Sequence, residues 1–218
     1  MNNIYLDELL SRYNALSSIK TQIAEAFDII KDCFINNNIL YICGNGGSAS
    51  DAEHIVGELM KAFILKRKIK NNDFINKMEE KYGKDSHFLI NSLQEGLRAI
   101  SLTGQPSLST AFANDVCPEL VFAQQIYVLG KPGDVLLGIS TSGNSKNVLH
   151  ALKIASAKKL KTILLTGKSG GKGFDLVDCS INAPSDVTYM IQEYHLPIYH
   201  TLCLMLEEYF YGDSCGRS

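Results

Sequence analysis

Apolar residues recur every three or four positions along the first part of the chain. The pattern runs from Tyr5 to Phe34. This spacing places the apolar side chains on one face of a helix. It predicts one long amphipathic helix, or two helices joined near Ser17-Ser18, within an N-terminal helical region of about residues 3–36.

Farther along, short apolar runs alternate with segments of helical spacing. The expected strands are 39–43, 98–102, 134–139, 161–165 and 177–181, and the expected helices are 49–63, 118–129, 146–158 and 188–211. Short strands that alternate with helices are typical of a parallel sheet covered by helices on both faces. The sequence therefore predicts an α/β fold with three layers, α/β/α, in which residues 1–218 form a single domain.

The stretch 65–97 interrupts this alternation. It is charged and polar, and it contains short helical patches such as 74–82. Loops of this length are usually functional or mobile. We interpret 65–97 as an insertion, which forms a surface excursion, a lid or an arm in an interface.

The composition is that of an ordinary globular protein. The chain has 218 residues, 45% of them hydrophobic and 20% charged, and a formal net charge of −2. Without a basic excess we expect no nucleic-acid partner. Without an apolar run of about 18 residues we expect no membrane-spanning helix, and the first residues are not expected to be a secretory signal. The six cysteines form no Cys-x-x-Cys pair, so we expect free thiols in a reducing cytoplasm.

The first loop with candidate chemistry follows the predicted strand 39–43 and has the sequence GNGGSASDA. Glycines let the backbone turn sharply and let a ligand approach closely. The following helix offers free N–H groups at its N-terminus, which suit an anion or a polyol. An equally good interpretation is a plain strand-to-helix turn with Ser48 or Ser50 as the N-cap.

The second such loop, GISTSGNSKN, follows the predicted strand 134–139. It carries four hydroxyl groups within six residues, at Ser140, Thr141, Ser142 and Ser145. Hydroxyls and the free amides of a helix N-terminus can hold a phosphate without a basic side chain. An N-cap cluster would explain one of these hydroxyls but not four, so the loop favours a phosphate site.

Two helices carry histidines that could act on a ligand. His54 and Glu58 are four residues apart, which places them on one helix face. They could ligate a metal or transfer protons, or they could be an exposed pair. On the last helix, Gln192 and His200 are separated by about 12 Å of helix rise. A kink at Pro197 or a neighbouring subunit would be needed to bring both to one ion. His195 and His200 lie in a largely apolar stretch of this helix, where a histidine is otherwise more often a core residue.

Taken in this order, the motifs resemble the sugar isomerase (SIS) domain family. The segments that carry the resemblance are the N-terminal helices, CGNGGSASDAEHIVGEL, AFANDV, LLGISTSGNSKNV and IQEYHLPIYH. Within the family, the chain is most similar to the members that act on a heptose phosphate. The resemblance implies one SIS domain, a cytoplasmic homotetramer with shared active sites, and an aldose–ketose isomerisation. The implied reaction converts sedoheptulose 7-phosphate into D-glycero-D-manno-heptose 7-phosphate.

The resemblance also implies roles for individual residues. Glu58 matches the general base of the family and His200 its general acid. The positions that match the sugar-phosphate site are Asn45, Gly46, Gly47, Ser48, Asp115, Ser140, Thr141, Ser142, Ser145 and Gln192. Zinc-containing members imply one Zn²⁺ per subunit, with His54, Glu58, Gln192 and His200 as its ligands.

The chain departs from the family pattern in three places. Many members have Leu-x-Gly-Arg-aromatic after the base, whereas this chain has LMKAF at 59–63. Met190 stands where a basic residue often precedes the IQE motif, and the insertion 65–97 is long. Two alternatives therefore stay open. The chain could isomerise another sugar phosphate, or it could be a non-catalytic SIS protein that binds a replication-initiation protein.

Overall fold

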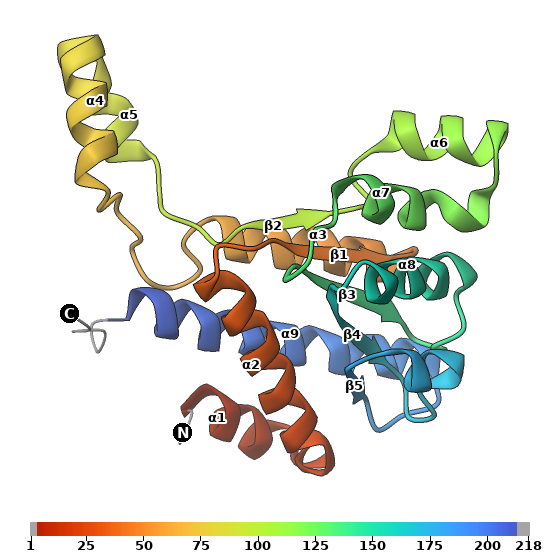
Figure 1. Ribbon diagram of the computed structural model, residues 1–218. Coiled ribbons are helices and arrows are strands. Elements are labelled where there is room, and N and C mark those ends of the chain that lie inside the picture. Colours follow the sequence, from red (N-terminus) through yellow and green to blue (C-terminus); the bar gives the residue numbers. More distant parts are fainter. Residues whose placement is uncertain (1–3, 213–218) are drawn as a thin grey trace.

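The centre of the molecule is a parallel sheet. A computed structural model describes residues 4–212 of the chain. Its strands are β1 (Leu40–Gly44), β2 (Ala99–Ser101), β3 (Val135–Ser140), β4 (Lys161–Thr166) and β5 (Cys179–Asn182). They stand in the order β2-β1-β3-β4-β5, and every neighbouring pair is parallel (Figure 1). All five predicted strands are confirmed, with ends that differ by one or two residues.

Helices lie on both faces of this sheet. One side carries α1 (Ile4–Arg12), α2 (Lys20–Ile35), α3 (Gly47–Met60) and α9 (Thr188–Tyr211). The other side carries α7 (Val121–Leu129) and α8 (Lys146–Ala157). The predicted three-layer α/β/α fold is therefore confirmed.

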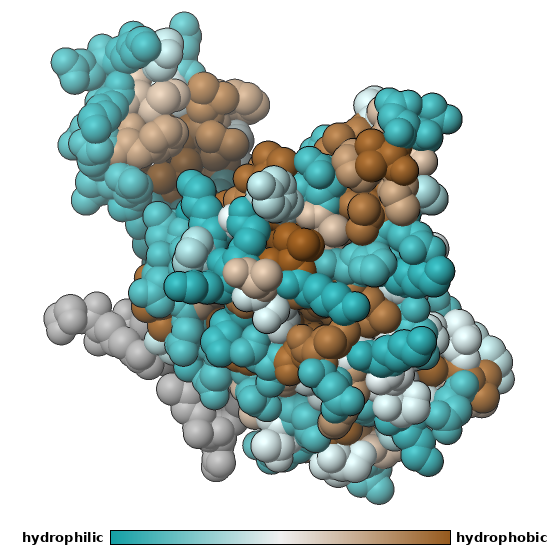
Figure 2. All heavy atoms as spheres, turned by 45° about the vertical axis from the view of Figure 1, so that its right-hand side comes forward, coloured by the Kyte–Doolittle hydropathy of each residue, from teal (hydrophilic) through white to brown (hydrophobic). Residues whose placement is uncertain are grey.

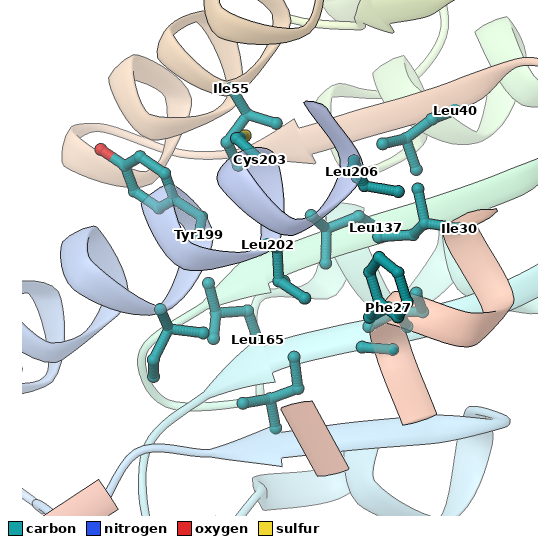
Figure 3. Packing of buried hydrophobic residues seen from close by; sticks show 14 of the residues in the cluster. Phe27, Ile30, Leu40, Ile55, Leu137, Leu165, Tyr199, Leu202, Cys203 and Leu206 are labelled. Carbon is teal, nitrogen blue, oxygen red and sulfur yellow. The ribbon is translucent and has the colours of Figure 1, made fainter. Parts of the chain in front are cut away.

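The central strands β1 and β3 are largely apolar because both of their faces are buried. In β1, Leu40 and Ile42 pack in the core beneath α2, α3 and α9, whereas Tyr41 and Cys43 pack beneath α7 and α8. Successive side chains of a strand point to opposite faces, so one short strand serves two cores. Figure 3 shows the first core, where Leu137 of β3 lies between α2 and α9.

The N-terminal region consists of two helices rather than one. Between α1 and α2 lies a short 3₁₀ segment, η1 (Asn14–Ile19), which includes the predicted junction at Ser17-Ser18. Leu16 and Ile19 of this segment are buried in the same core. The junction therefore changes the direction of the chain without exposing its apolar side chains.

The structure corrects the expected elements in three segments. Helix α6 (Pro106–Asp115) was not predicted, because none of its side chains is fully buried. The expected helix 118–129 begins as a 3₁₀ turn, η3 (Pro118–Leu120), before α7. Between β4 and β5, where no helix was expected, the chain forms a further 3₁₀ turn, η4 (Gly171–Leu176).

Part of the insertion 65–97 projects from the body of the molecule (Figure 1). We call residues 72–92 the arm; it contains α4 (Asn72–Tyr82), the turn η2 (Gly83–Asp85) and α5 (Ser86–Ser92). No side chain of α4 is buried, and within α5 the buried one is Ser86. The helical patch expected at 74–82 is therefore confirmed.

A buried ion pair anchors the start of this insertion. Nε of Arg67 donates to Oε1 of Glu207 on α9 over 2.8 Å, and both side chains are fully buried. The Glu207 carboxylate also accepts from the backbone amides of Phe63, Ile64 and Leu65. The Arg67 guanidinium donates to the carbonyls of Glu58 and Leu59, which lie at the C-terminal end of α3. Arg67 thus ties together the end of α3, α9 and the entry to the insertion.

Two further findings concern the whole described chain. In residues 4–212, no helix is long and apolar enough to cross a membrane. The cysteines of the same range are free, and all but the half-buried Cys117 are buried. Cys215 lies outside the described residues.

Candidate active site

Two loops meet where the order of the strands reverses. From the neighbouring strands β1 and β3 the sheet continues in opposite directions, to β2 and to β4. In open parallel sheets, ligands bind beyond the carboxyl ends of the strands at such a point. The loop after β1 is joined here to the start of α8, which follows the loop after β3, by a reciprocal amide pair between Asn45 and Asn147, with distances of 2.9 and 2.8 Å.

The loop after β3 leaves its hydroxyls free of helix capping. Ser145 occupies the N-cap position of α8, but its side chain makes no cap hydrogen bond. Its hydroxyl instead accepts from Oγ of Ser140 over 3.0 Å. Ser142 is exposed, and its Oγ accepts from the amide of Asn144. The N-cap interpretation of this loop is therefore wrong for Ser145, and donors remain at the start of α8 for an anion.

A glycine shapes this loop. Gly143 has a φ of +63°, and a Cβ there would come within 1.9 Å of the carbonyl oxygen of Gly170. The left-handed conformation and the close approach both require glycine. The hydroxyl loop is in this way packed against the segment that follows β4.

The loop after β1 accommodates Gln192 of α9. A Cβ at Gly47 would lie 2.6 Å from Nε2 of Gln192, so the amide fits because position 47 has no side chain. Asn45, Gly46 and Gly47 are exposed, whereas Ser48 is buried. The structure thus brings Gln192 next to the loop 45–48. Gly46 is the N-cap of α3, and Ser48 and Ser50 lie within the helix, so the interpretation of Ser48 or Ser50 as the N-cap is wrong.

A second cluster lies farther along α3 and α9. Nε2 of His54 lies 3.3 Å from Oε1 of Glu58 and 3.4 Å from Nε2 of His200. Nζ of Lys61 donates to the other oxygen of Glu58, Oε2, over 2.9 Å. The Glu58 side chain is 13% exposed. The two residues matched to the general base and the general acid therefore share one cluster, with His54 between them.

The electrostatics of this cluster follow from burial and from its neighbours. Burial lowers the pKa of His200, His54 lowers it further, and Glu58 acts in the opposite direction. Burial raises the pKa of Asp51, whereas its hydrogen bond from Tyr199 and the nearby His54 act to lower it. A neutral imidazole at His200 can exchange protons with sugar oxygens near neutral pH.

Helices α3 and α9 run side by side in the same direction. Gln192 lies against Gly47, and His200 lies against His54. Helix α9 continues through Pro197 without interruption. Gly47 and His54 are seven residues apart, or about 10 Å of helix rise. The phosphate-loop end and the His54 end of the site are therefore separated within one chain, and Gln192 belongs to the first of them.

Other residues singled out from the sequence lie elsewhere. Asp115 is exposed at the end of α6, where its Oδ1 accepts from Nδ2 of Asn114. No hydrogen bond in the described part of the chain joins it to either end of the site. His195 is fully buried, and its Nε2 lies 3.2 Å from the carbonyl oxygen of Thr166. Burial lowers the pKa of His195 to about 4. The core interpretation is correct for His195.

The side chains of this cluster are of the kinds that bind Zn²⁺, the metal that the resemblance implies, but they are not arranged as a metal site. Two imidazoles and a carboxylate are a donor set that Zn²⁺ accepts in proteins. Among residues 4–212, however, no group of three or more His, Cys, Asp or Glu side chains is arranged to hold a metal ion. The fit to zinc therefore rests on His54, Glu58 and His200 as donor types.

Sequence reasoning missed several residues of the site. The Tyr199 hydroxyl contacts both Asp51 and His54, and Lys61 contacts Glu58. Asp51 could have been found, because it precedes His54 by three residues on the same helix face. Tyr199 had no such signal, since its partners are more than 140 residues away in the chain.

Comparisons with known proteins show which family the chain belongs to. The family model described as "SIS domain" matches residues 4–89 and 87–167. A phosphoheptose isomerase of Helicobacter pylori is 40% identical over 196 residues, which cover 90% of this chain and 88% of that protein. One of Geotalea daltonii is 38% identical over 195 residues, covering 89% and 88% of the two chains.

Solved structures lead to the same family. The phosphoheptose isomerase GmhA of Neisseria gonorrhoeae matches with a TM-score of 0.70 at 31% identity, covering 92% of this chain and 94% of that chain. A phosphoheptose isomerase of Francisella tularensis matches with a TM-score of 0.72 at 29% identity, covering 94% and 95%. The chain therefore belongs to the SIS domain family and, within it, to the phosphoheptose isomerase family.

Proposed function

We propose that this chain is an aldose–ketose isomerase that converts sedoheptulose 7-phosphate into D-glycero-D-manno-heptose 7-phosphate. The observation that carries the proposal is the cluster in which His54 joins Glu58 and His200. The hydroxyl loop at 140–145 supports it, because it offers donors to the phosphate. The names of the relatives that match most of the chain support it as well.

The chemistry follows from the two residues assigned to proton transfer. Isomerisation moves one proton between adjacent carbons and another between their oxygens. In the proposal, the Glu58 carboxylate takes the carbon-bound proton and leaves an enediol-like intermediate. The His200 imidazole exchanges the proton of the neighbouring oxygen. The phosphate, held at the hydroxyl loop, supplies remote binding energy that positions the reacting carbons.

The same proposal includes one Zn²⁺ per subunit, held by His54, Glu58 and His200. When bound, such an ion would polarise the oxygens of the reacting carbons. Gln192 would join the ligand set from a neighbouring subunit, since it lies at the Gly47 end of its own chain. Titration of metal-free protein with Zn²⁺ against a chelating dye tests this, with one ion per subunit expected. Absence of binding would contradict it.

We further propose that the enzyme is a homotetramer with shared active sites. The separation of the phosphate loop from the His54 cluster supports this, because halves from two subunits could complete one site. The arm supports it too, since a pair of short helices without a buried apolar face is marginally stable alone. Its exposed apolar side chains include Phe88 at 75% and Leu89 at 42%. Figure 2 shows apolar side chains gathered on the arm and again over α6 and α7.

If the subunits assemble through the arm, a single charge placed on its apolar surface should weaken the assembly. Phe88→Asp is expected to lower the molecular mass measured by light scattering, because a carboxylate would have to be buried in the contact between copies. Helix content should be unchanged, since Phe88 is exposed within one chain. Asn76→Asp adds the same charge to the arm without removing an apolar side chain, and it should assemble like the wild type. An unchanged mass for Phe88→Asp would rule out the arm as a subunit contact.

The proposed reaction is tested by supplying the purified chain with defined sugars. We expect turnover of sedoheptulose 7-phosphate and none of unphosphorylated sedoheptulose, because the phosphate contributes the positioning energy. Turnover restricted to a pentose or hexose phosphate would replace the heptose assignment with another isomerase. A lack of turnover with every sugar phosphate, together with capture of a replication-initiation protein, would favour the non-catalytic alternative.

We place the enzyme in the cytoplasm as part of this proposal. Buried free thiols, as at Cys43 and Cys203, are typical of a reducing compartment. Fractionation of the source cells with an antibody to the chain tests the assignment, and recovery outside the cytoplasm would contradict it.

A further inference from the structure

The two ends of the insertion pair with each other at the base of the arm. Lys68 and Gln94 form an antiparallel bridge, and the amide of Glu95 donates to the carbonyl of Arg67 over 2.9 Å. Arg67 is itself held in the core by its buried ion pair with Glu207. The position of Gln94 is therefore fixed by the core of the molecule rather than by the projecting arm.

The Gln94 side chain reaches from this base to the segment that follows α3. Its Oε1 accepts from the backbone amide of Ala62 over 2.8 Å. Helix α3 ends at Met60, and Lys61 already has extended backbone angles, with φ −131° and ψ 174°. Hydrogen bonds within the helix no longer hold this segment, so Gln94 supplies an anchor from outside the helix.

Lys61 carries this anchor to the proposed general base. Nζ of Lys61 donates to Oε2 of Glu58 over 2.9 Å, while Oε1 of Glu58 lies 3.3 Å from Nε2 of His54. The last torsion of a glutamate side chain is otherwise loosely defined. With one oxygen engaged on each side, the plane of the carboxylate is fixed. The Lys61 side chain is 58% exposed on a flexible four-carbon stem, so its place depends on where its backbone is held.

We propose that Gln94 is a positioning residue for the proton transfer: by holding the amide of Ala62, it keeps Lys61 against Glu58 and so fixes the orientation of the carboxylate. The inference rests on the proposed function in that Glu58 is the base. It gives the insertion a part in the site. It also joins two departures from the family pattern, the insertion itself and the Lys61-Ala62 pair where many members have Gly-Arg. Gln94 does not touch the substrate in this scheme.

Gln94→Met removes the acceptor and keeps the approximate length of the side chain. We expect kcat for sedoheptulose 7-phosphate to fall about 10- to 100-fold, the scale of a small misplacement of a catalytic group. KM should change little, because the phosphate contacts are untouched. The unfolding midpoint should be unchanged, since Gln94 is exposed. Gln94→Glu keeps an oxygen acceptor for the amide of Ala62, so its kcat should stay much closer to that of the wild type.

A double variant shows whether Gln94 acts through Lys61. Lys61→Met alone should lower kcat. Adding Gln94→Met to it should cost little more, because the contact that Gln94 supports is already gone. The losses of two residues that act independently would instead multiply. Multiplied losses, or equal kcat values for Gln94→Met and Gln94→Glu, would overturn the proposal.

Asn91→Met is the matched control, because it removes an exposed amide from the insertion whose side chain has no hydrogen bond to the described residues. It should retain wild-type kinetics. Crystal structures of the substrate-free wild type and of Gln94→Met supply a readout that does not depend on turnover. We expect Nζ of Lys61 within hydrogen-bond distance of Glu58 in the wild type and away from it in the variant.

The two proposals can fail separately in this experiment. If the wild type turned over no sugar phosphate, the proposed function would fail, whereas the position of Lys61 in the two crystal structures would still test the link from Gln94. If Lys61 stays on Glu58 in Gln94→Met, the link is refuted even for an active isomerase.

Discussion

Replacement of Glu58 by glutamine is expected to lower kcat for sedoheptulose 7-phosphate by about 10²- to 10⁴-fold, the usual contribution of a general base. The amide has nearly the shape of the carboxylate, but it does not take up a proton at neutral pH. It can still contact His54 and Lys61, so the site should stay folded. Steady-state kinetics should show the loss in kcat with little change in KM, because the phosphate contacts are untouched.

A second glutamate on the same helix provides the control for this variant. Glu53 is exposed on α3, where its Oε1 accepts from Oγ1 of Thr103 over 2.9 Å. Glu53→Gln should retain wild-type kinetics, since an amide oxygen can accept the same hydrogen bond. His200→Gln should lose activity to a similar degree as Glu58→Gln. Turnover of Glu58→Gln within a few-fold of the wild type would remove Glu58 from its assigned role.

The second large effect is expected on stability, from Arg67→Met. This change leaves Glu207 buried without its cation, and it removes the donors to the carbonyls of Glu58 and Leu59. Breaking a buried ion pair by removing one partner typically costs about 3–5 kcal/mol. Denaturant titrations at one protomer concentration should show a fall of this size in the free energy of unfolding.

Two further variants separate the buried charge from lost packing. Arg67→Met/Glu207→Gln should be more stable than Arg67→Met alone, because the glutamine oxygen can still accept from the amides of 63–65 and no charge is left buried. Lys77→Met breaks an exposed pair with Asp73 on the arm and should leave the unfolding midpoint unchanged. If Arg67→Met and Arg67→Met/Glu207→Gln have the same free energy of unfolding, the buried charge of Glu207 is not the cause of the instability.

The fold was predictable because its signals are local. A strand buried on both faces appears in the sequence as a continuous apolar run, as at 39–43, and the alternation of strands and helices implies the layers. Helix α6 lacked such a signal because it buries none of its side chains. The arm was visible as an insertion, but nothing in its residues distinguished a lid from an interface arm.

The sequence predicted the individual side chains of the site but not which of them contact one another. The spacing of His54 and Glu58 on one helix face, and the hydroxyls of 140–145, are local patterns. The helix-rise argument correctly anticipated that Gln192 and His200 would not meet within one straight helix: Gln192 lies beside Gly47, and His200 lies beside His54, seven residues farther along α3. The Tyr199 hydroxyl belongs to no local pattern.

The sequence by itself determined the layers of this protein, the strand ends that carry its loops, and the residue types available for proton transfer. These follow from short-range periodicity and from the geometry of single helices and strands. The tertiary structure alone decided which groups share protons and charge. Asp51 and Tyr199 meet across 148 positions, and Arg67 and Glu207 across 140. Such contacts arise because α3 and α9 pack side by side on the sheet, and that packing depends on the whole core rather than on any one segment.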